Sequence, residues 1–152
     1  MSYLMHRVFY AATDHLEAEC EAFYQVLGDF NEKEAMPHGI LFVPVSLLPT
    51  MTDKRPFQAA IDDNIRSCRY YVLVLDSNWG SPQRSFTHDC ELAIQCAANP
   101  ALPMQEVVLL LKKSPAGIPG DLPDIEALKF STLEEYEQHW RLMLDKWLRS
   151  IL

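Results

Sequence analysis

The sequence predicts an α/β fold of three layers, with helices on both faces of a five-stranded parallel sheet. Short apolar runs alternate with amphipathic stretches along the chain, which is the pattern of a parallel sheet with crossover helices. The runs 70–75 (YYVLVL) and 106–111 (EVVLLL) are almost wholly apolar, as central strands buried on both faces are. The run 40–45 (ILFVPV) contains Pro44, which cannot donate to a strand ladder and is therefore expected at a sheet edge. Because right-handed crossovers leave few topologies, these observations predict the flavodoxin-like strand order 2-1-3-4-5, in which the second strand is an edge.

The first strand and the first helix are predicted near the N-terminus. Residues 7–12 (RVFYAA) predict the strand. Thr13 and Asp14 predict the cap of the helix, because Glu17 stands at the capping-box spacing from Asp14. Glu19 is expected outside the apolar stripe of this helix, together with Glu17 and Glu21. The stripe itself comprises Leu16, Cys20, Phe23, Tyr24 and Leu27.

Glycine and proline residues predict where this helix ends and where the next begins. Gly28 is a plausible stop, and the acidic stretch 31–34 is an alternative extension of the helix. A loop is predicted over 46–55, after which Pro56 suits the first position of a second helix. The expected apolar stripe of that helix is Phe57, Ile61, Ile65 and Cys68.

The C-terminal half predicts two further helices and a short strand. A helix is expected over 88–98, a long loop over 112–127, and a fifth strand over 127–130. Ser131 and Thr132 each precede a glutamate by three residues, which gives two overlapping capping boxes for the last helix. The apolar stripe expected on that helix is Leu133, Tyr136, Trp140, Leu144, Trp147 and Ile151.

Composition excludes several classes of function. The chain has 152 residues and a formal net charge of −8, so we expect one domain over 1–152 that binds neither nucleic acid nor anionic membrane. No apolar run has the length of a membrane span and no signal-peptide pattern is seen, which favours the cytoplasm. The four cysteines are scattered, and this spacing favours free thiols over a disulfide or a zinc site. They are Cys20, Cys68, Cys90 and Cys96.

A candidate site is predicted where the first and third strands end. In an open parallel sheet, ligands bind at the carboxyl ends of the strands, beside the point where strand order reverses. Thr13, Asp14 and Asp76 are expected to lie near one another there, and Glu91 is expected in the first turn of the following helix. Each has a plain structural alternative, since a helix cap, a turn or a favourable helix dipole accounts for the same residue types. The candidate ligand-binding residues are Thr13, Asp14, Asp76, Ser77, Asn78, Trp79 and Gly80.

Known nucleotide and hydrolase motifs do not account for this loop. The sequence has no G-x-G-x-x-G after the first strand, no G-x-x-x-x-G-K-[ST] and no G-x-S-x-G. The five histidines show no ligand spacing, and the pair His88 and Glu91 lacks a matching partner elsewhere, so no metal site is expected. Trp79 has an alternative interpretation as an apolar plug of the loop.

Four segments resemble the Toll/interleukin-receptor (TIR) superfamily, especially the TIR-like domains of unknown function found in bacteria. Residues 8–17 (VFYAATDHLE) are similar to the V-F-I-S-S-T and D-L opening of those domains, and 67–75 (SCRYYVLVL) to the segment leading into their third strand. Residues 77–79 (SNW) and 85–92 (SFTHDCEL) are similar to the S-x-N-Y and S-x-W-C-x-x-E-L patterns that follow. The resemblance covers roughly residues 6–150.

The resemblance implies a signalling or interaction domain that acts through self-association, with a second copy or another TIR-type protein as its partner. It also implies an alternative, because some TIR domains hydrolyse NAD at the nicotinamide–ribose bond with the glutamate that matches Glu91. NAD would then be a substrate and not a cofactor, and a carboxylate beside the ribose would stabilise an oxocarbenium-like state. A second alternative is nucleoside deoxyribosyl transfer, which also uses carboxylates on this fold.

The sequence departs from the family pattern at three places. Thr87 and His88 stand where the pattern has tryptophan and cysteine, and Ala11 and Ala12 stand where serines are expected. The loop after the second strand lacks the R-D-x-x-P-G signature of many receptor TIR domains. The first two departures bear on NAD cleavage, and the third bears on receptor-type adaptor binding.

Overall fold

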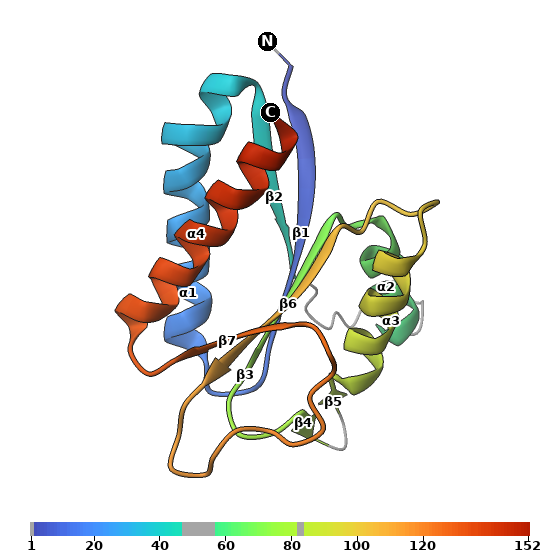
Figure 1. The fold of residues 1–152 in the computed structure, drawn as a ribbon, viewed down its shortest axis with the longest axis vertical. Coiled ribbons are helices and arrows are strands. Elements are labelled where there is room, and N and C mark those ends of the chain that lie inside the picture. The colour runs from blue at the N-terminus through green and yellow to red at the C-terminus, as the bar shows by residue number, and fades with distance from the viewer. Residues whose placement is uncertain (1, 47–56, 82–83) are drawn as a thin grey trace.

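A computed structural model describes residues 2–46, 57–81 and 84–152, and its centre is a parallel sheet of five strands (Figure 1). The strand order is β2-β1-β3-β6-β7, so the predicted flavodoxin-like class and the 2-1-3-4-5 order are confirmed. The strands are β1 (Leu4–Ala12), β2 (Ile40–Val45), β3 (Tyr70–Leu75), β6 (Glu106–Lys112) and β7 (Glu126–Phe130).

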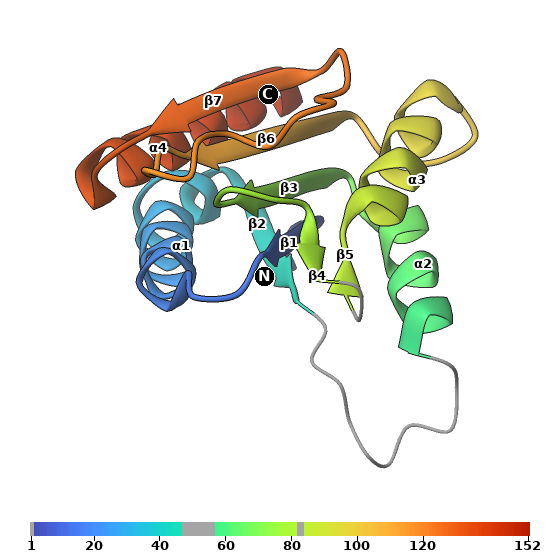
Figure 2. The ribbon, with the colours of Figure 1, turned by 90° about the horizontal axis from the view of Figure 1, so that it is seen from below.

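Four helices form the two outer layers. Seen along the sheet, α1 and α4 lie on one face and α2 and α3 on the other (Figure 2). The helices are α1 (Glu17–Phe30), α2 (Phe57–Ser67), α3 (Thr87–Ala98) and α4 (Leu133–Ile151). None of the helices within the described ranges has the length and apolar composition of a membrane span.

The strands supply a separate core to each face, because successive side chains of a strand alternate between faces. In β3, Tyr70, Val72 and Val74 belong to the core beneath α1 and α4. The residues between them, Tyr71 and Leu73, belong to the core beneath α2 and α3. All six residues of β3 are buried, as predicted for a central strand.

Helix α4 is fixed at both ends by specific bonds. Thr132 and Glu135 form the predicted capping box, in which the Glu135 amide donates to the Thr132 hydroxyl and the Thr132 amide to the Glu135 carboxylate. Near the other end, the Trp147 ring stacks on Tyr70 with centroids 4.0 Å apart, and its indole N–H donates to Glu106 Oε2 at 2.7 Å. Tyr136, Trp140, Leu144 and Trp147 are buried as expected, whereas Leu133 is exposed.

The predicted cap of α1 is wrong. The helix begins at Glu17 without a side-chain cap, and His15 before it has a left-handed backbone with φ of 69°. Thr13 instead continues the sheet, since its amide donates to the Val74 carbonyl at 3.1 Å. The pairing of β1 with β3 therefore holds Thr13 where a helix cap was expected.

The buried face of α1 is rotated from the predicted stripe. Glu19 is 4% exposed and Tyr24 is 44% exposed, which reverses the expectation for both residues. The helix packs against α4 as well as against the sheet, so a second contact surface determines which residues are buried. The buried set is Glu19, Ala22, Phe23, Val26, Leu27 and Phe30.

Gly28 does not end α1, and the alternative extension through the acidic stretch is confirmed. A π-helical turn (Asn31–Ala35) and a 3₁₀ turn (Met36–His38) follow directly. The chain turns at Gly39, whose φ of 73° is the left-handed conformation that glycine tolerates best.

The outer edge of β2 is closed by two features. The Asn31 side chain accepts a hydrogen bond from the Phe42 amide at 2.9 Å and donates one to the Phe42 carbonyl at 2.8 Å. Two residues further on, Pro44 has no amide proton to offer, and it lies on an edge strand as predicted. Both features remove backbone groups with which another strand could pair.

A two-stranded antiparallel piece, β4 (Gly80–Ser81) with β5 (Arg84–Ser85), was not predicted. Ile61 and Ile65 on α2, and Cys68 directly after it, are fully buried as expected. The proposed start of that helix at Pro56, and all but Ser46 of the preceding loop, lie outside the described residues.

Candidate functional site

Thr13 and Asp76 meet at the carboxyl ends of β1 and β3, which is the switch point of the sheet. Thr13 is 7% exposed, and its Oγ1 accepts a hydrogen bond from the Asp76 amide at 3.2 Å. Asp14, the third residue expected here, is exposed, and no bond joins it to Thr13 or Asp76 in the described part of the chain. The strand ends therefore hold a threonine and an aspartate in fixed relation.

The Asp76 carboxylate contains an atom that is enclosed without a partner. Its Oδ1 is out of contact with solvent and has no hydrogen-bond donor among the residues that the structure describes. An enclosed, unsatisfied acceptor destabilises a protein by about 1–3 kcal/mol. A hydroxyl or N–H group brought by a ligand would offset this penalty.

Lys112 and Glu19 form an ion pair near the same carboxyl ends of the strands. Lys112 ends β6, the strand beside β3, and its Nζ donates to Glu19 Oε1 at 2.6 Å. The Glu19 side chain is only 6% exposed, so this pair lies largely out of water. Glu19 was not expected here, although its position one turn before Phe23 and two turns before Val26 on a helix was a usable signal.

Two tyrosines extend the buried polar group beneath α1. The hydroxyl oxygens of Tyr10 and Tyr136 are 3.2 Å apart. Burial raises the pKa of both tyrosines well above the ordinary range, and the neighbouring Tyr136 hydroxyl raises the pKa of Tyr10 further. Both hydroxyls therefore stay neutral and act only as hydrogen-bonding groups.

The loop after β3 is held by its own side chains. Asn78 Oδ1 accepts from the Gly80 amide at 2.9 Å, and Gly80 has a positive φ of 110°. The Trp79 indole N–H donates to the Gly120 carbonyl at 2.9 Å and so joins this loop to the loop after β6. Trp79 also packs against the core beneath α2 and α3, which supports its interpretation as a plug of the loop.

Glu91 does not lie in the first turn of α3, and that expectation is wrong. The helix begins at Thr87, one residue earlier than expected, so the first-turn carboxylate is Asp89. Asp89 is 0% exposed, whereas Glu91 is exposed on the helix surface. Because residues two apart on a helix point about 200° apart, the two carboxylates face opposite sides of α3.

Asp89 belongs to a group of polar side chains between α2 and α3, which sequence reasoning missed. Gln58 Nε2 donates to Asp62 Oδ1 at 2.9 Å and to Asp89 Oδ1 at 2.8 Å. His88 Nε2 lies 3.3 Å from Asp62 Oδ1. We call these four residues, Gln58, Asp62, His88 and Asp89, the α2–α3 cluster.

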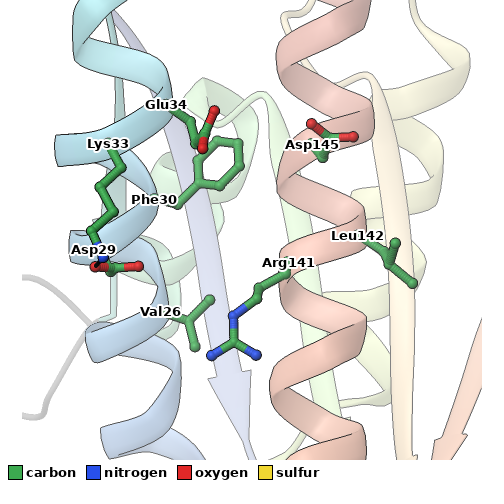
Figure 3. Close-up of a pocket in the computed structure, with 8 residues that line it drawn as sticks. All are labelled: Val26, Asp29, Phe30, Lys33, Glu34, Arg141, Leu142 and Asp145. Atoms are coloured by element: carbon green, nitrogen blue, oxygen red, sulfur yellow. Dashed lines mark ion pairs between the residues drawn. The ribbon is translucent and has the colours of Figure 1, made fainter.

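A groove of about 330 Å³ lies between α1 and α4 on the outside of the helical layer (Figure 3). Apolar side chains of both helices meet charged ones here, and the Lys33–Asp29 pair is 2.8 Å long. Leu142 lines this groove and is 58% exposed. The lining residues are Val26, Asp29, Phe30, Lys33, Glu34, Arg141, Leu142 and Asp145.

Comparison with known proteins adds no family to this geometry. No protein-family model matches the chain, and no curated protein matches it either.

Proposed function

We propose that this protein binds a small nucleotide-type ligand at the carboxyl ends of β1 and β3, as a TIR-like module. The observation that carries the proposal is the enclosed Asp76 Oδ1, which has no donor within the described ranges. It lies at the switch point of a 2-1-3-4-5 sheet, where this class of fold binds its ligands. The Asp76 Oδ1 atom lacks a hydrogen-bond donor, and a ribose hydroxyl is a small polar group that can donate to it.

The surroundings of Asp76 support a polar ligand. Thr13 holds the Asp76 backbone in place, so the acceptor is preorganised before a ligand arrives. Lys112 is 34% exposed and already paired with Glu19, so its charge is not free to bind a phosphate. Recognition of sugar hydroxyls at Asp76 is therefore favoured over recognition of phosphate at Lys112.

The reaction in this proposal rests on the TIR resemblance. That resemblance assigns Glu91 to cleavage of the nicotinamide–ribose bond of NAD, and the exposure of Glu91 leaves its carboxylate accessible. A carboxylate near the ribose stabilises the positive charge that develops as nicotinamide leaves. Binding at Asp76 and cleavage by Glu91 are separable and are tested separately.

The test uses the purified chain with NAD and measures both nicotinamide release and binding by calorimetry. Glu91→Gln is expected to abolish release and to keep binding. Asp76→Ala is expected to weaken binding roughly tenfold or more, because a hydrogen bond to a charged group contributes about 1.5–3 kcal/mol. The same variant should unfold at an equal or higher urea concentration, since it removes an enclosed acceptor without a donor.

Glu21→Gln is the matched control, because Glu21 is an exposed glutamate on a different helix. It should leave release and binding unchanged. Background release and no heat of binding with the wild-type chain would contradict the proposal for NAD.

Self-association is a second candidate function, and the α1–α4 groove favours it. The groove combines exposed Leu142 with side chains of both signs, including Arg141 and Asp145. A two-fold interface brings each residue of a patch against other residues of the same patch, so mixed charges are self-complementary. The occupant in this case is a second copy of the chain.

Light scattering during size-exclusion chromatography distinguishes this candidate from a purely ligand-binding role. A dimer is expected for the wild-type chain and a monomer for Leu142→Glu. Leu133→Glu is the matched control, because Leu133 is an exposed leucine on the same helix but outside the groove. A wild-type chain that stays monomeric at every concentration would rule out self-association through this groove.

A further inference from the structure

We propose that the α2–α3 cluster is a binding site for a divalent transition-metal cation such as Zn²⁺. Asp62, His88 and Asp89 each offer one ligand atom, and these atoms lie within 4.8 Å of one another. One imidazole with two carboxylates is a donor set that zinc, cobalt and manganese accept. The inference does not depend on the ligand or the reaction proposed above.

The distances within the cluster are close to those of a metal shell. Ligand atoms about 2.1 Å from a tetrahedral Zn²⁺ are roughly 3.4 Å from each other. His88 Nε2 and Asp62 Oδ1 are already 3.3 Å apart. No separation among the three ligand atoms exceeds 4.8 Å, and the His88 side chain, which is 60% exposed, has room to move inward.

The Gln58 side chain lies between the carboxylates of Asp62 and Asp89 and bonds to both. Its amide nitrogen donates to Asp62 Oδ1 and to Asp89 Oδ1, so a partial positive charge already lies between them. Rotation of the amide by half a turn presents Oε1 in place of the nitrogen. Gln58 can therefore change from a donor to the carboxylates into a fourth ligand to the cation.

Burial of Asp89 gives the cation a further role. Asp89 is 0% exposed, and a carboxylate so far from water is stabilised by a cation close to its oxygens. Asp89 also lies in the first turn of α3, where the helix dipole contributes about +0.5 charge and opposes a cation. Against this half charge the cluster offers two anionic donors, the carboxylates of Asp62 and Asp89.

The site would add a metal link between two helices that already meet through packing and through the contacts of Gln58 with Asp89 and of His88 with Asp62. Gln58 and Asp62 come from α2, and His88 and Asp89 come from α3. A cation bound to both helices stabilises only the folded chain, so its binding raises the unfolding temperature.

Titration of the chelator-treated chain with Zn²⁺ in a calorimeter tests the proposal. One equivalent is expected to bind, with a rise in unfolding temperature at saturation, and Mg²⁺ is expected to bind much more weakly. His88→Ala and Asp62→Asn should each lower the Zn²⁺ affinity roughly tenfold or more. The His88 side chain is 60% exposed, so His88→Ala should change the unfolding temperature without metal little.

Three variants serve as matched controls. Asp63→Asn changes the neighbouring, more exposed aspartate of α2, and His38→Ala changes an exposed histidine elsewhere. Cys20→Ser removes the one cysteine that is not fully buried. All three should keep the wild-type affinity. Absence of a saturable Zn²⁺ signal in the wild-type chain, or equal affinity in His88→Ala and Asp62→Asn, would overturn the proposal.

Discussion

At the scale of single residues, Glu19 is a carboxylate kept almost entirely out of water beside one lysine. Its side chain is 6% exposed, and the Lys112 ammonium lies 2.6 Å from its Oε1. A buried ion pair contributes little net stability compared with an apolar pair, but removing one member leaves an unpaired charge. The energetic importance of the pair therefore shows when Lys112 alone is lost.

We expect Lys112→Met to lower the free energy of unfolding by about 1–3 kcal/mol, measured by urea denaturation. The lower part of the range reported for buried pairs applies because Lys112 is 34% exposed and solvent screens part of the interaction. The double variant Glu19→Gln/Lys112→Met should be more stable than Lys112→Met, since it no longer contains the buried charge.

Lys113→Met is the control for this prediction, because Lys113 is the exposed neighbour on the same chain segment. It should leave the unfolding midpoint unchanged. Equal destabilisation by Lys112→Met and Lys113→Met would mean that the pair with Glu19 has no energetic role.

At the scale of elements, β2 is an edge strand whose sequence prevents further pairing. Asn31 occupies both the amide and the carbonyl of Phe42, and Pro44 lacks an amide proton. Open strand edges recruit other strands, and natural sheets block them with such devices. The self-association considered above is accordingly placed on the helical layer and not on this edge.

Asn31→Ala is expected to reduce the free energy of unfolding by about 1–3 kcal/mol, because two buried backbone groups lose their partner. Combined with Pro44→Val, which restores a donor to the edge, it should also promote dimers or larger species in light scattering. Asn99→Ala is the control, because it removes only an exposed hydrogen bond from the Ala101 amide; it should lower the free energy of unfolding less and should not promote larger species. An unchanged midpoint for Asn31→Ala would show that water replaces the side chain without loss.

The strand order and the contact at the switch point could both be predicted from the sequence. Strand order followed from local signals, since Pro44 belongs at an edge and the apolar run 70–75 belongs at the centre. The meeting of Thr13 and Asp76 followed from that order. These features depend on short segments and on general rules of sheet topology.

Other features depend on contacts that no single segment reveals. Glu19 is buried because α1 packs on α4 as well as on the sheet, and its partner Lys112 is 93 residues away. The first turn of α3 contains Asp89 and not Glu91, because the helix begins one residue earlier than expected. Asp89 is buried because its side of α3 packs against α2, where Gln58 donates to it from 31 residues away.

At the scale of the whole molecule, two cores share one sheet. Trp140 and Trp147 lie in the core beneath α1 and α4, and Cys68, Cys90 and Cys96 lie in the core beneath α2 and α3. Each strand contributes alternate residues to both cores, so loss of the sheet disrupts both cores at once. The two cores should therefore unfold together, although few side chains pass from one to the other.

Separate reporters make this expectation testable. In a Trp79→Phe/Cys20→Ser variant, the remaining tryptophans report only the first core and the remaining thiols only the second. Burial raises the pKa of Cys68 and of Cys90 to about 11, so these thiols react with a thiol reagent only after unfolding. Urea titrations followed by tryptophan fluorescence and by brief thiol labelling are expected to give the same midpoint and the same slope, as in a two-state transition. If the thiols became reactive at lower urea than the fluorescence change, α2 and α3 would be an independent unit of stability, and the sheet would not couple the two faces.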